Sequence, residues 1–243
     1  MTVWISHRGL KDNHAENSLE AFRAAVAGGF SWLETDLRCT KDGIIVLSHD
    51  PDFYRTAGSA RPIGESAWTE VQQLKLNGGE SVPTFESFAE EFDRSHWVLD
   101  IKPQTALRTI ETLAKWSSHS SERFAHLNSR CRFLLWTQSD ERLCRRFFPG
   151  ADYFPQEAAC YRAALSAKLL AGIGGGIRRG SSYALVETFA GMSFHLKQVV
   201  EVYHRKGAKV LAFLPASGNE VRSALTAGFD EILTDREIEQ HLV

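Results

Sequence analysis

Cysteine is scarce in this chain of 243 residues, and long hydrophobic runs are missing. The four cysteines are scattered and show no CxxC spacing: Cys39, Cys131, Cys144 and Cys160. This scatter argues against a zinc site or a disulfide framework, and it favours a reducing compartment, the cytoplasm. No stretch approaches the ~20 apolar residues that a membrane-spanning helix requires. The first residues resemble no signal peptide, because they lack a charged start and a long apolar segment.

An excess of positive charge is also absent. The chain has 28 Lys and Arg against 30 Asp and Glu, which gives a formal net charge of −2. A nucleic-acid partner is therefore not expected, since such proteins carry a basic patch or a high pI. A small anionic substrate remains compatible with this composition, because a local field can oppose the net charge.

Strand-like and helix-like segments alternate along the whole chain. The predicted strands are Val3–Ser6, Trp32–Leu37, Trp97–Ile101, Arg132–Trp136, Asp152–Phe154, Tyr183–Val186, Lys209–Leu214 and Glu231–Thr234. The predicted helices are Ser18–Ala27, Thr84–Phe92, Thr105–Ser117, Asp140–Phe147, Glu157–Ala171, Leu196–Arg205, Gly218–Ala227 and Arg236–Leu242. This pattern predicts an α/β fold, a (β/α)₈ TIM-type barrel that forms one domain over residues 1–243.

One further strand-like run, Ile44–Ser48, follows the second strand too closely for a parallel crossover, which needs a dozen or more residues. Lys41-Asp42-Gly43 is a good turn sequence, so we expect a hairpin that returns His49 to the barrel mouth. The segment of about 50–83 that follows is longer than a usual loop. We expect a small insertion there, with a short helical piece around Ala67–Leu76.

Polar residues gather at the predicted carboxyl ends of the first three barrel strands, where barrel enzymes carry their chemistry. They are His7, Arg8, Glu34, Asp36, Asp100 and Lys102, with His49 on the hairpin arm. Glu34 and Asp36 stand two apart and share one side of their strand. Together with Asp100 they form a set of oxygen ligands suited to Mg²⁺ or Ca²⁺.

The other charged groups in this set suit phosphoryl chemistry. His7 and His49 can take and give a proton near neutral pH. Arg8 and Lys102 can hold phosphate oxygens. Simpler interpretations stay open: Glu34 could pair with an arginine, Asp36 could cap a helix, and Lys102 could be a surface residue.

Five residues elsewhere leave a choice between structure and function. Glu16-Asn17 could cap the helix near Ser18 or position substrate. Asp235 is interpreted as an N-cap of the last helix. His195 has a modest chance of a role, and Trp136 is expected in the core rather than at the pocket.

The motifs in their order along the chain resemble the glycerophosphodiester phosphodiesterase family. The resemblance is carried by Ser6-His7-Arg8-Gly9, Glu16-Asn17-Ser18, Glu34-Thr35-Asp36-Leu37, Thr40-Lys41-Asp42-Gly43, Ser48-His49-Asp50, Arg55-Thr56, Val82-Pro83-Thr84-Phe85-Glu86, Leu99-Asp100-Ile101-Lys102-Pro103, Gly228-Phe229-Asp230 and Thr234-Asp235-Arg236. Any one of these motifs alone would be weak, but their ordered set is specific.

The resemblance implies a TIM-type barrel with an insertion after the second strand. It also implies hydrolysis of substrates such as glycerophosphocholine or glycerophosphoethanolamine to an alcohol and glycerol 3-phosphate. His7 and His49 would be the acid–base pair, in an unassigned order, and Glu34 and Asp36 would be metal ligands. The family usually has glutamate where this chain has Asp100, often tryptophan where it has Phe213, and usually proline in the segment that holds His14-Ala15.

Two alternatives to this function stay open. One is a lysophospholipase D-type or other phosphodiesterase on the same barrel, with the insertion shaping the leaving-group pocket. The other is a non-catalytic phosphate-binding relative, for which Asp100 is the only support. The sequence does not specify the head group, the physiological metal or the oligomeric state.

Overall fold

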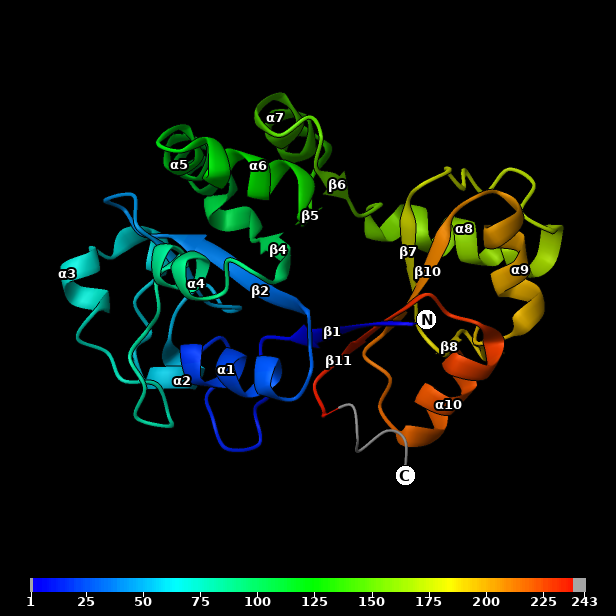
Figure 1. Ribbon diagram of the computed structural model, residues 1–243, viewed down its shortest axis with the longest axis horizontal. Coiled ribbons are helices and arrows are strands. Elements are labelled where there is room, and N and C mark those ends of the chain that lie inside the picture. Colours follow the sequence, from blue (N-terminus) through cyan, green and yellow to red (C-terminus); the bar gives the residue numbers. More distant parts are fainter. Residues whose placement is uncertain (1, 238–243) are drawn as a thin grey trace. The chain divides into compact units, whose positions relative to one another are not determined.

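The structure is a computed structural model that describes residues 2–237 (Figure 1). The chain divides into two compact units. The larger unit comprises His7–Ala27 and Ser31–Tyr153, and the smaller unit comprises Met1–Ser6, Gly28–Phe30 and Phe154–Val243. The single domain expected over 1–243 stays a prediction. Within the described residues, no helix has the length and apolar character that crossing a bilayer would require.

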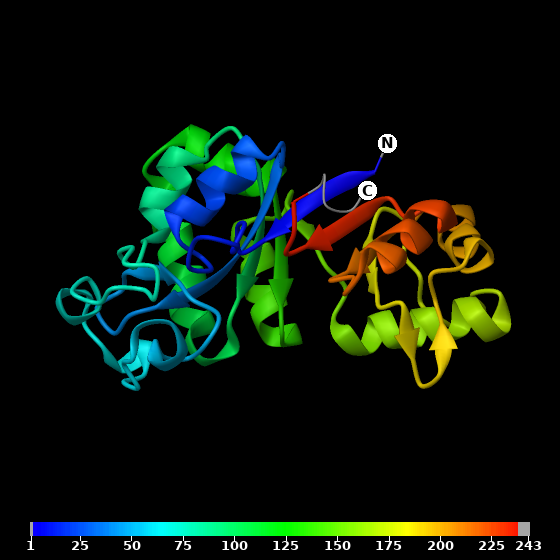
Figure 2. The ribbon, with the colours of Figure 1, turned by 90° about the horizontal axis from the view of Figure 1, so that it is seen from below.

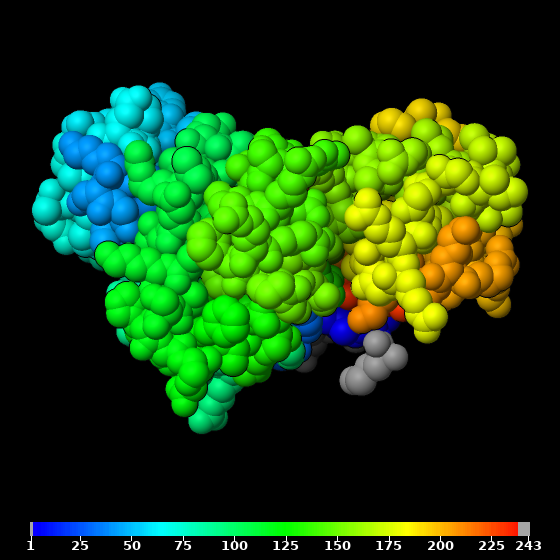
Figure 3. Space-filling view, turned by 90° about the horizontal axis from the view of Figure 1, so that it is seen from above, coloured from blue at the N-terminus to red at the C-terminus, as the bar shows by residue number. Residues whose placement is uncertain are grey.

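The larger unit is built on a parallel sheet in the order β2-β4-β5-β6. Its strands are β2 (Trp32–Cys39), β4 (His96–Ile101), β5 (Cys131–Leu135) and β6 (Asp152–Tyr153). Its main helices are α1 (Leu19–Ala27), α4 (Phe85–Glu91), α5 (Ala106–Ser118), α6 (Ser121–Ser129) and α7 (Gln138–Phe147). Helices α5–α7 (green) cover one face of this unit in Figure 3. Strand β2 is almost wholly buried, as expected for a strand covered on both sides.

Aromatic side chains fill the space between the helices and the sheet of the larger unit. Phe22 of α1 meets Phe88 of α4 edge to face, with ring centroids 4.9 Å apart. Phe85 packs in the same way against Trp97 of β4 at 5.9 Å. Such pairs add to the burial energy of the rings, so this layer fixes α1 and α4 against the strands that carry the acids.

The strands of the smaller unit are parallel and follow the order β1-β11-β10-β7 within the sheet. Its strands are β1 (Val3–His7, ending in the first residue of the larger unit), β7 (Ser182–Leu185), β10 (Lys209–Phe213) and β11 (Glu231–Thr234). Its helices are α8 (Glu157–Leu170), α9 (Lys197–Arg205) and α10 (Gly218–Ala227). A two-stranded hairpin of β8 (Thr188–Phe189) and β9 (Met192–Ser193) completes it.

All eight predicted barrel strands occur, with ends that differ from the prediction by at most two residues. The helices expected before residue 236 occur as well, and α6 and the β8–β9 hairpin are additions that the sequence did not predict. The helix expected at Arg236–Leu242 lies outside the described residues from position 238 onward.

The hairpin predicted after the second strand is confirmed. Strand β3 (Ile45–Leu47) pairs antiparallel with β2, placing Leu47 opposite Leu37. The turn closes through the Gly43 amide, which donates to the Thr40 carbonyl at 3.1 Å. Gly43 adopts φ +87°, a conformation that glycine reaches without a Cβ penalty.

The segment after the hairpin has short helices and an apolar centre of its own. It contains α2 (Tyr54–Ala57), η1 (Ile63–Glu65) and α3 (Trp68–Val71), the last within the helical piece expected around Ala67–Leu76. Its buried cluster consists of Val46, Phe53, Ile63, Val71, Leu76 and Val82. Through Val46 the segment (cyan in Figure 2) packs on β3, so it is anchored next to the strand that leads to His49.

Candidate active site

Three carboxylates lie together on two neighbouring strands of the larger unit. Glu34 and Asp36 project from β2, and Asp100 on β4 stands directly opposite Asp36 in the strand register. One oxygen from each of the three lies within 4.8 Å of the others, and all three residues are buried. The spacing of two along β2 puts both acids on one side of the strand, as the sequence indicated.

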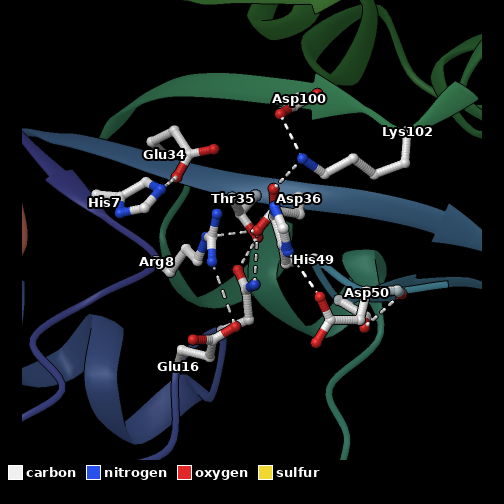
Figure 4. A network of polar contacts seen from close by, with 12 residues as sticks. His7, Arg8, Glu16, Glu34, Thr35, Asp36, His49, Asp50, Asp100 and Lys102 are labelled. Carbon is white, nitrogen blue, oxygen red and sulfur yellow. Dashed lines mark hydrogen bonds and ion pairs between the residues drawn. The ribbon is translucent and has the colours of Figure 1, made fainter. Parts of the chain in front are cut away.

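Two cations and an amide approach this carboxylate cluster (Figure 4). Lys102 Nζ lies 2.8 Å from Asp36 Oδ1 and 2.7 Å from Asp100 Oδ2. Arg8 Nε lies 2.9 Å from Asp36 Oδ2, which also accepts a hydrogen bond from Asn17 Nδ2 at 2.9 Å. The alternatives of a surface lysine and a helix-capping aspartate are therefore wrong, because Lys102 and Asp36 meet inside this buried cluster.

The pKa values of the carboxyl groups diverge because their partners differ. Burial and the neighbouring charges of Asp36 and Asp100 raise the pKa of Glu34 well above its ordinary value. Burial also raises the pKa of Asp100, although Lys102 opposes this. For Asp36 the effect of burial is outweighed by Lys102 and Arg8, so its pKa is lowered.

The cluster has the chemistry of a site for a hard divalent cation. Its ligands are carboxylate oxygens, which Mg²⁺ and Ca²⁺ prefer. Glu34 Oε2 is buried and has no hydrogen-bond partner among the described residues. When all five groups are ionised, three carboxylates and two cations leave one negative charge, and buried charge of this kind needs compensation. The residues therefore fit a divalent metal ion.

His7 lies beside the cluster, at the end of β1. Its Nε2 is 3.8 Å from Glu34 Oε2, and the residue is 7% exposed. The chain then turns sharply, with φ +61° at Arg8 and +81° at Gly9. The Arg8 amide donates to the Glu34 carbonyl at 3.0 Å, which ties this turn to β2.

His49 follows β3 and is more accessible than His7. Its side chain is 39% exposed, and Nδ1 lies 2.8 Å from Asp50 Oδ1. Its carbonyl accepts two hydrogen bonds from the Arg38 guanidinium, at 3.1 and 2.5 Å. Both the ring and the backbone of His49 are thus held by charged partners, and the ring leaves Nε2 available for a substrate.

Trp136 is a residue of this site that sequence reasoning placed wrongly in the core. It follows β5, is 50% exposed, and donates from Nε1 to Asp100 Oδ1 at 2.8 Å. Lys102 Nζ lies 5.3 Å from the centre of its ring. Its place directly after β5 was the available signal, because β5 pairs with β4, the strand that carries Asp100.

Asn17 holds a central place that the sequence left between a capping and a substrate role. Besides its bond to Asp36, its side-chain oxygen accepts a hydrogen bond from Thr35 at 2.8 Å. His195, by contrast, is buried in the smaller unit, where its ring packs 4.6 Å from Phe229. Packing of this kind favours a structural role for His195.

The sequence matches the Glycerophosphoryl diester phosphodiesterase family over residues 7–238. A probable glycerophosphodiester phosphodiesterase 2 of Mycobacterium tuberculosis is 28% identical over 54% of this chain, and the match spans 50% of that protein. A glycerophosphodiester phosphodiesterase of Bacillus altitudinis is 22% identical, with 97% of this chain and 95% of that protein covered. Lysophospholipase D GDPD1 of Rattus norvegicus is 30% identical over 49% of this chain and 45% of that protein.

Solved structures share the fold at low sequence identity. The glycerophosphoryl diester phosphodiesterase domain of Rv2277c from Mycobacterium tuberculosis has a TM-score of 0.82 and 16% identity, covering 99% of this chain and 98% of that one. A phosphodiesterase of Oleispira antarctica in complex with the product sn-glycerol-3-phosphate has a TM-score of 0.75 and 19% identity, covering 100% and 97%.

These likenesses confirm the predicted fold class, a TIM-type barrel of eight parallel strands with surrounding helices. The match of the family's sequence to almost the whole chain confirms the predicted enzyme class, a phosphodiesterase. The chain belongs to the Glycerophosphoryl diester phosphodiesterase family.

Proposed function

We propose that this protein hydrolyses glycerophosphodiesters to an alcohol and glycerol 3-phosphate, with His7 and His49 as the acid–base pair and a divalent cation on Glu34, Asp36 and Asp100. The observation that carries the proposal is the buried carboxylate cluster, with its ligand oxygens within 4.8 Å. Mg²⁺ or Ca²⁺ bound there would neutralise charge that develops on the phosphoryl oxygens.

The phosphate of the substrate would be held by Arg8 and Lys102. Lys102 uses two of its three N–H donors on Asp36 and Asp100, which leaves one for a phosphate oxygen. Arg8 faces Asp36 with Nε, and its guanidinium carries further donors. With a divalent cation added, the single net negative charge of the buried groups becomes one net positive charge, which matches a phosphodiester monoanion.

The two histidines would move protons on opposite sides of the phosphorus. One takes the proton of the nucleophile, and the other gives a proton to the leaving alkoxide. The nucleophile is either water or the glycerol hydroxyl beside the ester; in the second case a water then opens the cyclic phosphate to give glycerol 3-phosphate. His7 is well placed for this by its position at the carboxylate cluster, and His49 by its fixed ring with Nε2 available.

Two classes of leaving alcohol are candidates: short head groups and lipid-like groups. We propose short ones first, glycerophosphocholine or glycerophosphoethanolamine. The similarity to a lysophospholipase D favours a lysophospholipid as the second candidate. We propose the cytoplasm as the compartment, because the four cysteines are buried and free.

The test is a panel of metals and substrates. Protein treated with a chelator is supplied with Mg²⁺, Ca²⁺ or Mn²⁺ and offered glycerophosphocholine, glycerophosphoethanolamine or lysophosphatidylcholine. Release of glycerol 3-phosphate from the first two is expected with at least one metal. Hydrolysis of lysophosphatidylcholine alone would select the second candidate, and no hydrolysis under any condition would favour a non-catalytic phosphate-binding protein.

The same assay tests the histidine pair. His7→Ala and His49→Ala should each reduce kcat by ~10²-fold or more. His119→Ala is the matched control, because His119 is exposed and its ring nitrogen Nδ1 contacts the Lys115 carbonyl of α5, away from the carboxylate cluster. Near-normal activity of either catalytic variant would refute the acid–base assignment.

A further inference from the structure

One arginine of the insertion contacts both sides of the candidate site. Arg55, on α2, donates from Nε to Asp50 Oδ2 at 2.7 Å. Its two terminal nitrogens donate to the two carboxylate oxygens of Glu16, at 3.0 and 2.6 Å. A guanidinium that uses its whole donor edge in this way fixes the orientation of both carboxylates, as well as their charge.

The contact of Arg55 with Asp50 connects it to His49. Asp50 accepts a hydrogen bond from Arg55 at Oδ2 and contacts the His49 ring through Oδ1, so it links the two residues. Figure 4 shows the contact between His49 and Asp50. Contact with a carboxylate sets the orientation and the tautomer of a histidine ring. Arg55 in turn prevents Asp50 from rotating away.

The contact of Arg55 with Glu16 connects it to Arg8. Glu16, already held by Arg55, lies 3.4 Å from Arg8, and Arg8 contacts Asp36 of the carboxylate cluster at 2.9 Å. The cations Arg55 and Arg8 together keep the pKa of Glu16 below its ordinary value, despite burial that would raise it. Glu16 therefore stays ionised and bridges the two arginines.

Arg55 is not required to hold the insertion together. The insertion has its own apolar cluster, and Asn77 binds its backbone through the carbonyls of Arg55 and Thr56, not through the guanidinium. The Arg55 side chain is 51% exposed, and ion pairs at such positions contribute little to stability. Its contacts point to the site rather than to the core of the insertion.

We propose that Arg55 is a positioning residue that fixes His49 through Asp50 and Arg8 through Glu16. The insertion then completes the active site, in addition to any influence it has on the leaving group. This inference rests on the proposed function, because it assigns Arg55 a task only if His49 and Arg8 act on the substrate.

The test compares two arginines of the same insertion. Arg55→Ala should lower kcat/KM by on the order of tenfold, because displacing a reacting group by ~1 Å is costly. Arg55→Lys keeps the charge but not the two-pronged geometry, so it should recover only part of the loss. Arg61→Ala is the control: Arg61 is equally exposed, at 52%, and pairs with Glu70 within the insertion. Its activity should not change, and all variants should keep the thermal unfolding midpoint of the parent.

Double-mutant cycles separate positioning from a general structural effect. In a His49→Ala background, Arg55→Ala should no longer lower kcat and should act only through KM, by way of Arg8. In an Arg8→Ala background, the KM effect should disappear instead. Residues that act as a unit give such non-additive losses of activity. A general structural defect would instead lower the activity of the His49→Ala and Arg8→Ala variants by the same factor as that of the parent.

Each outcome decides between the two proposals. If Arg55→Ala is as active as the parent, or its loss is unchanged in both backgrounds, the positioning role is wrong while the proposed function stands. If His49→Ala is itself fully active, the acid–base assignment fails, and Arg55 has no catalytic histidine to position.

Discussion

Asp100 is held by two donors, one on each of its carboxylate oxygens. Trp136 Nε1 donates to Oδ1 and Lys102 Nζ to Oδ2, at 2.8 and 2.7 Å. A carboxylate has about four lone-pair sites, so both oxygens can still face a cation. The indole thus does for Asp100 what an outer partner does for many metal ligands, by fixing the direction in which it points.

This support predicts a measurable role for the indole N–H. Trp136→Phe keeps an aromatic ring near Lys102 but removes the donor to Asp100. The apparent affinity for the activating metal, or the activity, should fall by about tenfold. Activity measured as a function of metal concentration checks this, with Trp68→Phe in the apolar cluster of the insertion as control. An unchanged metal dependence would mean that Lys102 alone orients Asp100.

At the residue scale, the sequence located the charged groups but not their pairing. The sequence predicted that three of these residues lie near one another, because the carboxyl ends of parallel strands meet at one edge of the sheet. They are His7, Glu34 and Asp100. Trp136 could not be assigned in this way, because an aromatic residue after a strand has the same sequence pattern whether it is buried or half-exposed. The partners of Arg55 lie 5 and 39 residues away, and loop conformation alone brings Glu16 within reach.

The turn between β1 and α1 is the element that places His7 and Arg8. At Gly9, φ is +81°, and an added Cβ would lie 2.5 Å from Ala21 Cβ on α1. No such contact is possible without displacement of the turn or the helix. Gly9 is therefore required for close approach as well as for its backbone angle.

Comparing Gly9 with Gly43 separates the need for close approach from the need for a positive φ. Gly43 in the β2–β3 turn has a similar φ of +87°, but an added Cβ would meet nothing within 4 Å. Gly43→Ala should cost ~1–2 kcal/mol of unfolding free energy from the backbone alone. Gly9→Ala should cost more and should also reduce kcat/KM, because His7 and Arg8 move with the turn. Urea unfolding and kinetics on both variants check this; equal costs would show that the turn adjusts freely.

At the element scale, periodicity and turn chemistry predicted most of the architecture. The β2–β3 hairpin followed from a loop too short for a parallel crossover. Helix α6 was missed because it buries only Leu127, so its sequence lacks the apolar stripe by which helices are detected. Its start is set by the Ser120 side chain, which accepts from the Glu122 amide, in a run of serines typical of loops.

For the molecule as a whole, the buried Glu34 carboxyl is a cost to folding that a metal ion would offset. Burial and the charges of Asp36 and Asp100 raise the pKa of Glu34 well above its ordinary value of 4.5. At neutral pH the unfolded chain ionises Glu34 freely. The metal-free folded chain must instead keep a proton on it or bury a repelled charge, so this acid lowers the free energy of unfolding.

Glu34→Gln should therefore stabilise the metal-free protein while abolishing its activity. At pH 7 the variant should have the higher free energy of unfolding, because its amide carries no charge that burial and the neighbouring acids disfavour. The gain should shrink as the pH falls towards about 4.5 and be absent below it, where glutamate is protonated in both states. Denaturant unfolding in the presence of a chelator, followed across this range of pH, measures the difference.

A divalent metal ion should make the parent more stable than the Glu34→Gln variant, the reverse of their order without metal. Mg²⁺ or Ca²⁺ at 100 times its dissociation constant should stabilise the parent by about 2.7 kcal/mol and the Gln variant by much less. K⁺ at matched ionic strength is the control for screening. Equal stabilisation of both proteins by the divalent ion would remove Glu34 from the ligand set. A smaller stabilisation of the variant by the divalent ion would show that the Glu34 carboxylate binds the metal. The metal dependence of folding and that of hydrolysis would then involve the same carboxylate oxygen.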